Sequence, residues 1–153
     1  MLADILARGL TVVFVGTAKS TTSARAGHYY ANPRNMFWNL LQATGLTEGE
    51  WLTPSDDRRV LEYGVGLTDL VPNRAASSDA QLRPGDYDVA AFIQKAELFE
   101  PMIVAFNGEK AATKVAQHSS SQAPIQQVAT QSSERNGRTS ANGLQFTRAE
   151  APA

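Results

Sequence analysis

Val12–Trp38, VVFVGTAKSTTSARAGHYYANPRNMFW, is the stretch that decides the fold. The apolar, largely β-branched run Leu10–Val15 predicts a strand buried on both faces of a parallel sheet. From Gly16 to Pro33 the chain is rich in Gly, Ser and Thr, which indicates a loop. A helix follows from Asn35. An α/β protein binds its ligand in such a crevice, just past the carboxyl end of a strand.

The rest of the chain continues this alternation of strands and helices. Helical periodicity predicts helices at Asn35–Thr44, Pro54–Tyr63, Asp88–Phe99 and Gly108–Ala116. Apolar runs predict further strands at Gly66–Val71 and Met102–Phe106, and the remaining assignments are a helical turn at Asp4–Arg8 and a polar loop at Asn73–Pro84. The order β-α-α-β-α-β-α predicts an α/β fold, a three-layer α/β/α sandwich with a central parallel sheet.

The composition changes after the last predicted helix. Gln117–Ala153 is rich in Ser, Gln, Thr and Ala, and no period of 2 or 3.6 is sustained there. Such a segment buries too little apolar surface to offset the entropy lost on ordering. We therefore expect one domain over residues 1–116 and a disordered or loosely packed polar tail over residues 117–153.

Overall composition narrows the function classes. The 153 residues suffice for one domain, and 42% hydrophobic with 19% charged residues is typical of a soluble globular protein. A net charge of -1 argues against a protein that binds nucleic acid through a broad phosphate-binding surface. It is compatible with an enzyme that binds a few phosphates through backbone amides. The chain has no cysteine, and we expect no metal or cofactor. No signal peptide or apolar run of roughly 18 residues is present, so we expect a cytoplasmic protein without a membrane segment.

The segment Gly16-Thr17-Ala18-Lys19-Ser20 follows the first predicted strand. A glycine there permits a tight turn whose backbone N–H groups point into the crevice, where they suit a phosphate or a developing oxyanion. The spacing matches neither a P-loop nor a G-x-G-x-x-G motif. A plain turn is the alternative interpretation of these five residues.

Two adjacent tyrosines, Tyr29 and Tyr30, lie in the predicted loop. Such rings can stack on a flat ligand, although one can instead pack the loop onto the core while the other is exposed. His28 is expected to be solvated. Asn35 can cap a helix and donate its amide into the crevice, whereas the aromatic pair Phe37–Trp38 is expected in the core.

Asp69 stands near the end of the apolar strand Gly66–Val71, where a carboxylate is costly unless it has a partner or a role. In a parallel sheet this end of the strand faces the Gly16 turn. Asp69 can therefore orient a water or stabilise a sugar cation, or alternatively cap the following loop. The segment Asn107–Lys110 is interpreted as a strand end, tight turn and helix start, with pocket lining as a weaker alternative.

Four segments together resemble one protein family: DILARGLTVVFVG, SARAGHYYANPRNMFWNLLQATGLT, LEYGVGLTDLV and PMIVAFNGEKAA. They resemble the mismatch-specific uracil-DNA glycosylases, the Mug and thymine-DNA glycosylase branch of the uracil-DNA glycosylase superfamily. ANPRNMFW is the most distinctive part. The resemblance implies a monomeric DNA repair enzyme that flips uracil out of a G·U mismatch or single strand and hydrolyses its N-glycosidic bond.

The resemblance also implies roles for individual residues. Tyr30 stacks on the flipped base. Beside the Gly16 turn, the backbone of Thr17 and Ala18 contacts the base edge and the leaving uracil anion. The two further positions carried over are Ser23, which shapes the pocket, and Asn35, which opens the following helix.

Two departures from the family pattern stand out. Many members have Gly-Ile-Asn-Pro-Gly, whose asparagine positions the hydrolytic water, but the matching residue here is Ala18. We therefore predict Asp69 as the catalytic residue in its place. Nothing after Lys114 resembles the family's last strand and Pro-Ser loop, which indicates a truncated or frame-altered end without the loop that wedges into DNA.

The departures keep two other functions open. One is a non-catalytic family member that binds a base or DNA weakly. The other is a small nucleotide- or phosphate-binding α/β enzyme.

Overall fold

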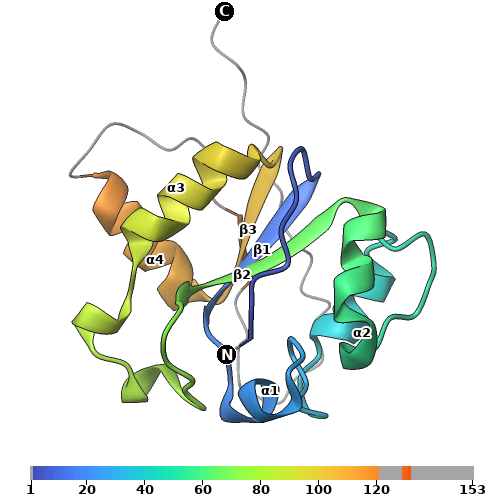
Figure 1. Cartoon of the computed structure of the whole chain (residues 1–153), viewed down its shortest axis with the longest axis horizontal. Coiled ribbons are helices and arrows are strands. Elements are labelled where there is room, and N and C mark those ends of the chain that lie inside the picture. Colours follow the sequence, from blue (N-terminus) through green and yellow to red (C-terminus); the bar gives the residue numbers. More distant parts are fainter. Residues whose placement is uncertain (1, 121–128, 132–153) are drawn as a thin grey trace, which may run out of the picture.

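The computed structural model describes residues 2–120 and 129–131 of the chain. Four parallel strands form one sheet in the order β2-β1-β3-β4 (Figure 1). The strands are β1 (Val12–Ala18), β2 (Val65–Val71), β3 (Ile103–Asn107) and β4 (Ala129–Gln131). The predicted α/β sandwich with a central parallel sheet is confirmed.

Helices cover both faces of this sheet. The α-helices are α1 (Thr21–Ala26), α2 (Phe37–Ala43), α3 (Val89–Phe99) and α4 (Glu109–Ser119), and the 3-10 helices are η1 (Pro54–Tyr63), η2 (Asp79–Gln81) and η3 (Pro84–Asp86). In Figure 1, α2 lies on one side of the sheet and α3 and α4 lie on the other. The short helix α1 lies beyond the carboxyl end of β1, which it follows in the chain.

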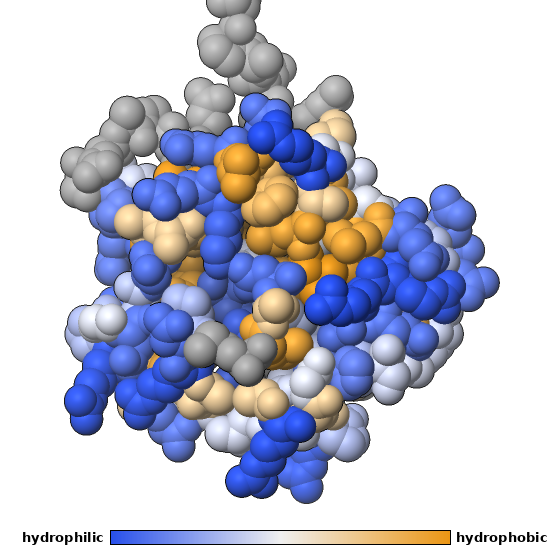
Figure 2. Space-filling model, in the orientation of Figure 1, coloured by the Kyte–Doolittle hydropathy of each residue, from blue (hydrophilic) through white to orange (hydrophobic). Residues whose placement is uncertain are grey.

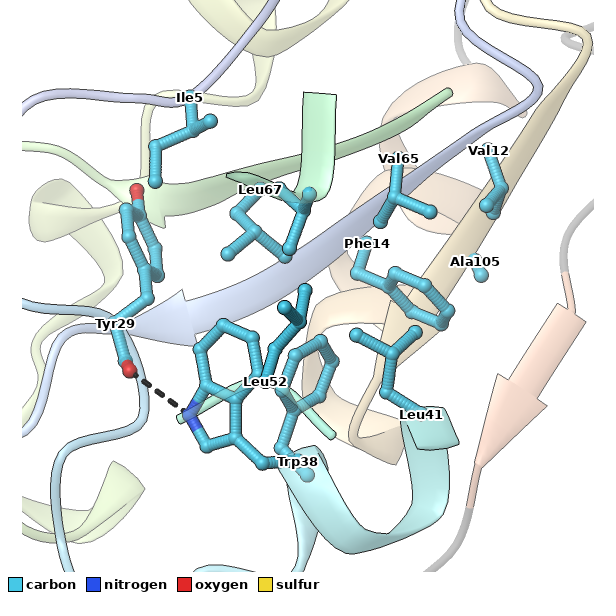
Figure 3. Close-up of a cluster of buried hydrophobic side chains, with 12 residues drawn as sticks. Ile5, Val12, Phe14, Tyr29, Trp38, Leu41, Leu52, Val65, Leu67 and Ala105 are labelled. Carbon is cyan, nitrogen blue, oxygen red and sulfur yellow. Dashed lines mark hydrogen bonds between the residues drawn. The ribbon is translucent and has the colours of Figure 1, made fainter. Parts of the chain in front are cut away.

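Alternate residues of β1 belong to two separate cores, because successive side chains of a strand point to opposite faces. Val12 and Phe14 pack with the residues of α2. Figure 3 shows this first core, which also contains Ile5, Tyr29, Trp38, Leu41, Leu52, Val65, Leu67 and Ala105. Val13 and Val15 pack on the other side against α3 and α4. We call these two sides of the sheet the α2 face and the α3 face.

The strand order creates a switch point beside β1. The chain passes from β1 to β2 on one side of β1, and then returns to place β3 on the other side. Pairing of β1 with β2 continues to Ala18, whereas pairing with β3 ends at Val15. The last residues of β1 therefore extend beyond their last pair with β3, at the carboxyl ends of the strands, which is the usual ligand position in such sheets.

Two details of the predicted Gly16 loop were wrong. First, β1 continues through Ala18, because Gly16 pairs with Asp69 and Ala18 with Val71, so these residues extend the sheet and form no turn. Second, the loop contains α1. Ser20 caps this helix by accepting from the Ser23 N–H, and Gly27 ends it at a φ of 74°. These capping bonds stabilise α1. The helix has no apolar periodicity, so the sequence pattern did not predict it.

The amino-terminal segment also differs from its prediction as a helical turn. Ile5 forms an antiparallel bridge with Leu67, and each N–H donates to the other's carbonyl, at 2.9 and 2.8 Å. β2 is an edge strand of the sheet, and this contact covers part of its open backbone. The predicted helix Pro54–Tyr63 has the expected bounds but is a 3-10 helix.

Some residues of the predicted tail belong to a helix and a strand of the fold. α4 runs past Ala116 to Ser119, and Ala129–Gln131 pairs in parallel with the end of β3 as β4. These three residues join the sheet by backbone pairing, although the sequence analysis found no sustained period in this segment. Residues 121–128 and 132–153 lie outside the described residues, and the domain boundary at residue 116 stays a prediction. Within the described ranges, no helix is long and apolar enough to cross a membrane.

Candidate functional site

Three predicted site residues meet on the α2 face at the carboxyl end of β1. Gly16 lies two residues after Phe14 on β1, and Asp69 lies two residues after Leu67 on β2. Residues two apart on a strand face the same side, so both belong to the α2 face together with Phe14 and Leu67. The register places Asp69 directly beside Gly16. The predicted juxtaposition of these two residues is therefore present, and the Tyr30 hydroxyl lies against the same point.

Close packing explains the glycine at position 16. A Cβ atom on Gly16 would lie 2.4 Å from Asp69 Oδ1 and 3.6 Å from the Tyr30 hydroxyl. The first distance is far below van der Waals contact. Gly16 therefore admits the Asp69 carboxylate and does not form the predicted turn.

Asp69 is buried, and its partner is a buried lysine. Lys19 Nζ lies 3.2 Å from Asp69 Oδ2, and the two side chains are only 6% and 3% exposed. Burial raises the pKa of Asp69, and the Lys19 ammonium group opposes that rise. This pairing replaces the alternative in which Asp69 caps the following loop.

The sequence reasoning missed Lys19 as a site residue in its own right. A carboxylate inside an apolar strand requires a cation, and Lys19 is the first basic residue after the neighbouring strand. That combination could have identified the pair.

Tyr30 is held in a strained conformation beside Asp69. Its φ is 51°, a left-handed value that non-glycine residues seldom adopt. Its ring stacks on Phe37 with centroids 4.0 Å apart and planes 24° apart. Burial raises the pKa of Tyr30, the Asp69 carboxylate raises it further, and the nearby Asn107 amide opposes the rise. Tyr30 is thus a neutral hydroxyl facing a carboxylate.

Tyr29 packs the loop onto the core, as the alternative interpretation of the tyrosine pair predicts. It is 2% exposed, and its carbonyl accepts from Trp38 Nε1 at 3.2 Å (Figure 3). Its hydroxyl donates to Asp4 Oδ1 at 3.3 Å. Burial, followed by the Asp69 and Asp4 carboxylates, raises the pKa of Tyr29. Phe37 and Trp38 are buried, which confirms their predicted place in the core.

Two buried side chains hold the segment between α1 and α2, residues 27–36, which we call the tyrosine loop because it carries Tyr29 and Tyr30. Ser23 Oγ accepts from the Ala31 N–H at 3.1 Å, and its pocket-shaping role stays a prediction. Asp57 Oδ2 on η1 accepts from the Tyr29 N–H at 2.9 Å, and its Oδ1 lies 3.4 Å from His28 Nδ1. The His28 ring is therefore in contact with Asp57, with 39% of its side chain exposed, and is not simply solvated. Asp57 lies in the first turn of η1, and the sequence analysis did not identify it as a long-range anchor.

The remaining predicted residues lie around this cluster. Thr17 and Ala18 end β1 beyond its last pair with β3. Asn35 is exposed and its Oδ1 accepts from the Phe37 N–H at 2.9 Å, so it supports the start of α2 although Met36 is the cap residue. Asn107 is the last residue of β3 and faces the same side of the sheet as Ala105, the α2 face. Its interpretation as a pocket-lining residue stays a prediction.

A shallow groove of about 490 Å³ lies beside α4, which begins directly after Gly108. Its lining is charged and polar: Asp79, Glu109, Lys110, Thr113, Lys114 and Gln117. Over the described part of the chain, no three potential metal-binding side chains come together. Figure 2 shows apolar residues gathered on the upper part of one face and more hydrophilic residues towards its lower edge, where the strands end.

Fold and site together define a class of protein. It is a three-layer α/β protein with a buried carboxylate and a tyrosine at the carboxyl ends of its parallel strands, where such folds bind ligands. The family model of the uracil DNA glycosylase superfamily matches residues 4–148. The chain therefore belongs to the uracil DNA glycosylase superfamily, whose members are glycosylases and hydrolases associated with DNA repair. This match extends well beyond Lys114, where the resemblance seen in the sequence ended.

Proposed function

We propose that this chain is a uracil-DNA glycosylase of the mismatch-specific branch, with Asp69 as its catalytic residue. Its substrate is uracil in a G·U mismatch or in single-stranded DNA, and it acts by hydrolysis. The observation that carries the proposal is the buried Asp69 carboxylate beside Gly16, with the Tyr30 hydroxyl at the same point. A buried acid at the end of the sheet where such folds bind ligands is a candidate for acid–base chemistry.

Base binding uses Tyr30 and the end of β1. Phe37 covers one face of the Tyr30 ring, and in this proposal a flipped base stacks on the opposite face once the loop has opened. A base that stacks on an aromatic ring gains about 1–3 kcal/mol. Thr17 and Ala18 lie beyond the last pair of β1 with β3. Their backbone groups can form hydrogen bonds to the edge of the base and stabilise the leaving uracil anion.

Hydrolysis requires a group that activates water, and Ala18 has no polar side chain for this task. The Asp69 carboxylate orients a water molecule and accepts its proton as the oxygen attacks C1′ of the sugar. The N-glycosidic bond breaks, and its electron pair leaves with uracil. The negative charge of Asp69 also stabilises the positive charge that develops on the sugar.

The site is closed in this structure. Asp69 is 4% exposed, and the Tyr30 hydroxyl packs against Gly16. A base reaches Asp69 only if the Tyr30 loop moves, so binding of DNA and opening of the loop are coupled. Ser23 and Asp57, which anchor that loop, therefore influence substrate binding without touching the substrate.

The experiment is uracil release from a G·U duplex and from a uracil-containing single strand under single-turnover conditions. We expect Asp69→Asn, which keeps the shape of the side chain, to lower the rate about 10²–10⁴-fold. Asp88→Asn is the matched control, because Asp88 caps α3 at an exposed position and asparagine caps equally well. Equal rates for wild type and Asp69→Asn would remove Asp69 from the mechanism.

Ala18 also favours a second candidate, a family member that binds a base in DNA without cleaving it. This candidate predicts that the wild-type protein binds uracil-containing DNA more tightly than normal DNA but releases no uracil. A third candidate, a nucleotide-binding enzyme, predicts tight binding of free mononucleotides, which a glycosylase binds poorly.

A further inference from the structure

We propose that Lys19 is a positioning residue that keeps the Asp69 carboxylate ionised and oriented within its closed site. The inference rests on the proposed function for its catalytic meaning. The Lys19–Asp69 pair itself stands on geometry alone. Lys19 directly follows the last residue of β1, Ala18, and Asp69 lies on the neighbouring strand β2.

Burial of both partners is the first argument. The two side chains are 6% and 3% exposed, with Nζ and Oδ2 3.2 Å apart. A carboxylate taken out of water favours its neutral form unless a cation compensates. A neutral Asp69 can neither accept a proton from water nor stabilise a sugar cation.

The other charged or titratable groups near Asp69 do not replace Lys19. Asp4 raises the pKa of Asp69, and its own carboxylate is paired with Lys95. Tyr29 is a neutral hydrogen-bonding group that lowers the pKa of Asp69 less than Lys19 does. Tyr30 is neutral as well, since its own pKa is raised. Lys19 is thus the cation that opposes burial at this site.

Lys19 is held in place by structure on both sides. Its carbonyl accepts from the Ala76 N–H at 2.9 Å. The next residue, Ser20, caps α1. The Lys19 Nζ also lies 5.7 Å from the centre of the Tyr29 ring, which adds a cation–π contact. A lysine anchored in this way differs from a surface lysine that samples many rotamers.

The test is the pH dependence of uracil release for wild type, Lys19→Gln and Lys19→Arg, between about pH 5 and pH 9.5. Activity requires ionised Asp69, so the rate falls as pH drops through the pKa of that group. We expect Lys19→Gln to shift this fall in rate, the acidic limb of the pH profile, to higher pH by about one unit or more. At a pH on the acidic limb, the variant should then release uracil about tenfold more slowly than wild type, and raising the pH should restore its rate. Lys19→Arg keeps the positive charge, and its limb should stay near that of wild type.

Two controls separate this role from others. Arg59→Gln removes a half-exposed positive charge paired with Glu62 on η1, and should leave the limb unmoved. Treatment with borohydride during the reaction traps any covalent link between an amine and the sugar. A trapped link at Lys19 would make it a nucleophile and overturn its assignment as a positioning residue, as would an unmoved acidic limb in Lys19→Gln.

A readout independent of activity distinguishes failure of this inference from failure of the proposed function. Titration of the Asp69 carboxyl carbon by NMR should show a higher pKa in Lys19→Gln than in wild type, whether or not uracil is released. If Lys19→Gln does not fold, the double variant with Asp69→Asn, which removes both charges, should recover folding. A double variant that folds no better than the single one would contradict the inference.

Discussion

At the scale of single residues, Gly16 is the most constrained position. Gly16→Ala places a methyl group 2.4 Å from Asp69 Oδ1, and the Lys19 pair prevents the carboxylate from retreating freely. We expect the free energy of unfolding to fall by about 1–3 kcal/mol, as for other overpacked sites. Urea denaturation measures this change, and uracil release should fall with it.

Gly85→Ala is the matched control for that substitution. Nothing lies within 4 Å of a Cβ atom at Gly85, which belongs to the exposed helix η3. Its unfolding free energy should stay within about 0.5 kcal/mol of wild type. Equal losses in the two variants would show that close packing at Gly16 is not the cause.

Tyr30 carries a second residue-scale prediction. Tyr30→Phe keeps the ring on Phe37 and removes a buried hydroxyl, so uracil release should stay within a few-fold of wild type. Tyr30→Ala removes the stacking surface, and a loss of about 1–3 kcal/mol corresponds to roughly 5- to 150-fold weaker processing of DNA. A rate measured for both variants at subsaturating DNA checks this, and similar rates would exclude base stacking on Tyr30.

At the scale of elements, η1 is the support of the tyrosine loop through Asp57. Asp57→Ala leaves the buried Tyr29 N–H without its acceptor, and we expect the unfolding free energy to fall by about 1–3 kcal/mol. DNA binding should weaken as well, because the loop is less fixed. Arg58→Ala, an exposed change on the same helix, should change stability by no more than about 0.5 kcal/mol in the same melts.

At the scale of the whole molecule, the buried tyrosines make the folded state sensitive to alkali. Burial raises the pKa of Tyr29 and Tyr30, so the native state keeps protons that the unfolded chain loses above about pH 10. Stability is therefore complete below that pH and declines as pH rises, by about 1.4 kcal/mol per pH unit for each tyrosine. Thermal melting between pH 8 and pH 11 measures the decline, and Tyr30→Phe should make it less steep. Parallel curves for the two proteins would contradict this assignment.

The sequence alone determined the layered fold and the place of the site. Apolar runs identified β2 and β3 and the body of β1, because a parallel strand buried on both faces has a distinctive composition. The position of Asp69 in such a run, and of Gly16 after another, predicted their encounter. The family resemblance of the ANPRNMFW segment agrees with the superfamily match. These features depend on local periodicity, which a sequence displays directly.

Only the tertiary structure decided how the site is held together. Lys19, just after β1, pairs with Asp69 on the neighbouring strand β2. Asp57 on η1 accepts from the Tyr29 backbone, and Ile5 covers the edge of β2. Each contact joins residues that are far apart in the chain, and none follows from periodicity. α1 and β4 were missed for the same reason, since capping bonds and backbone pairing stabilise them without an apolar pattern. Local sequence sets which face a residue takes, whereas its partner depends on the packing of distant segments.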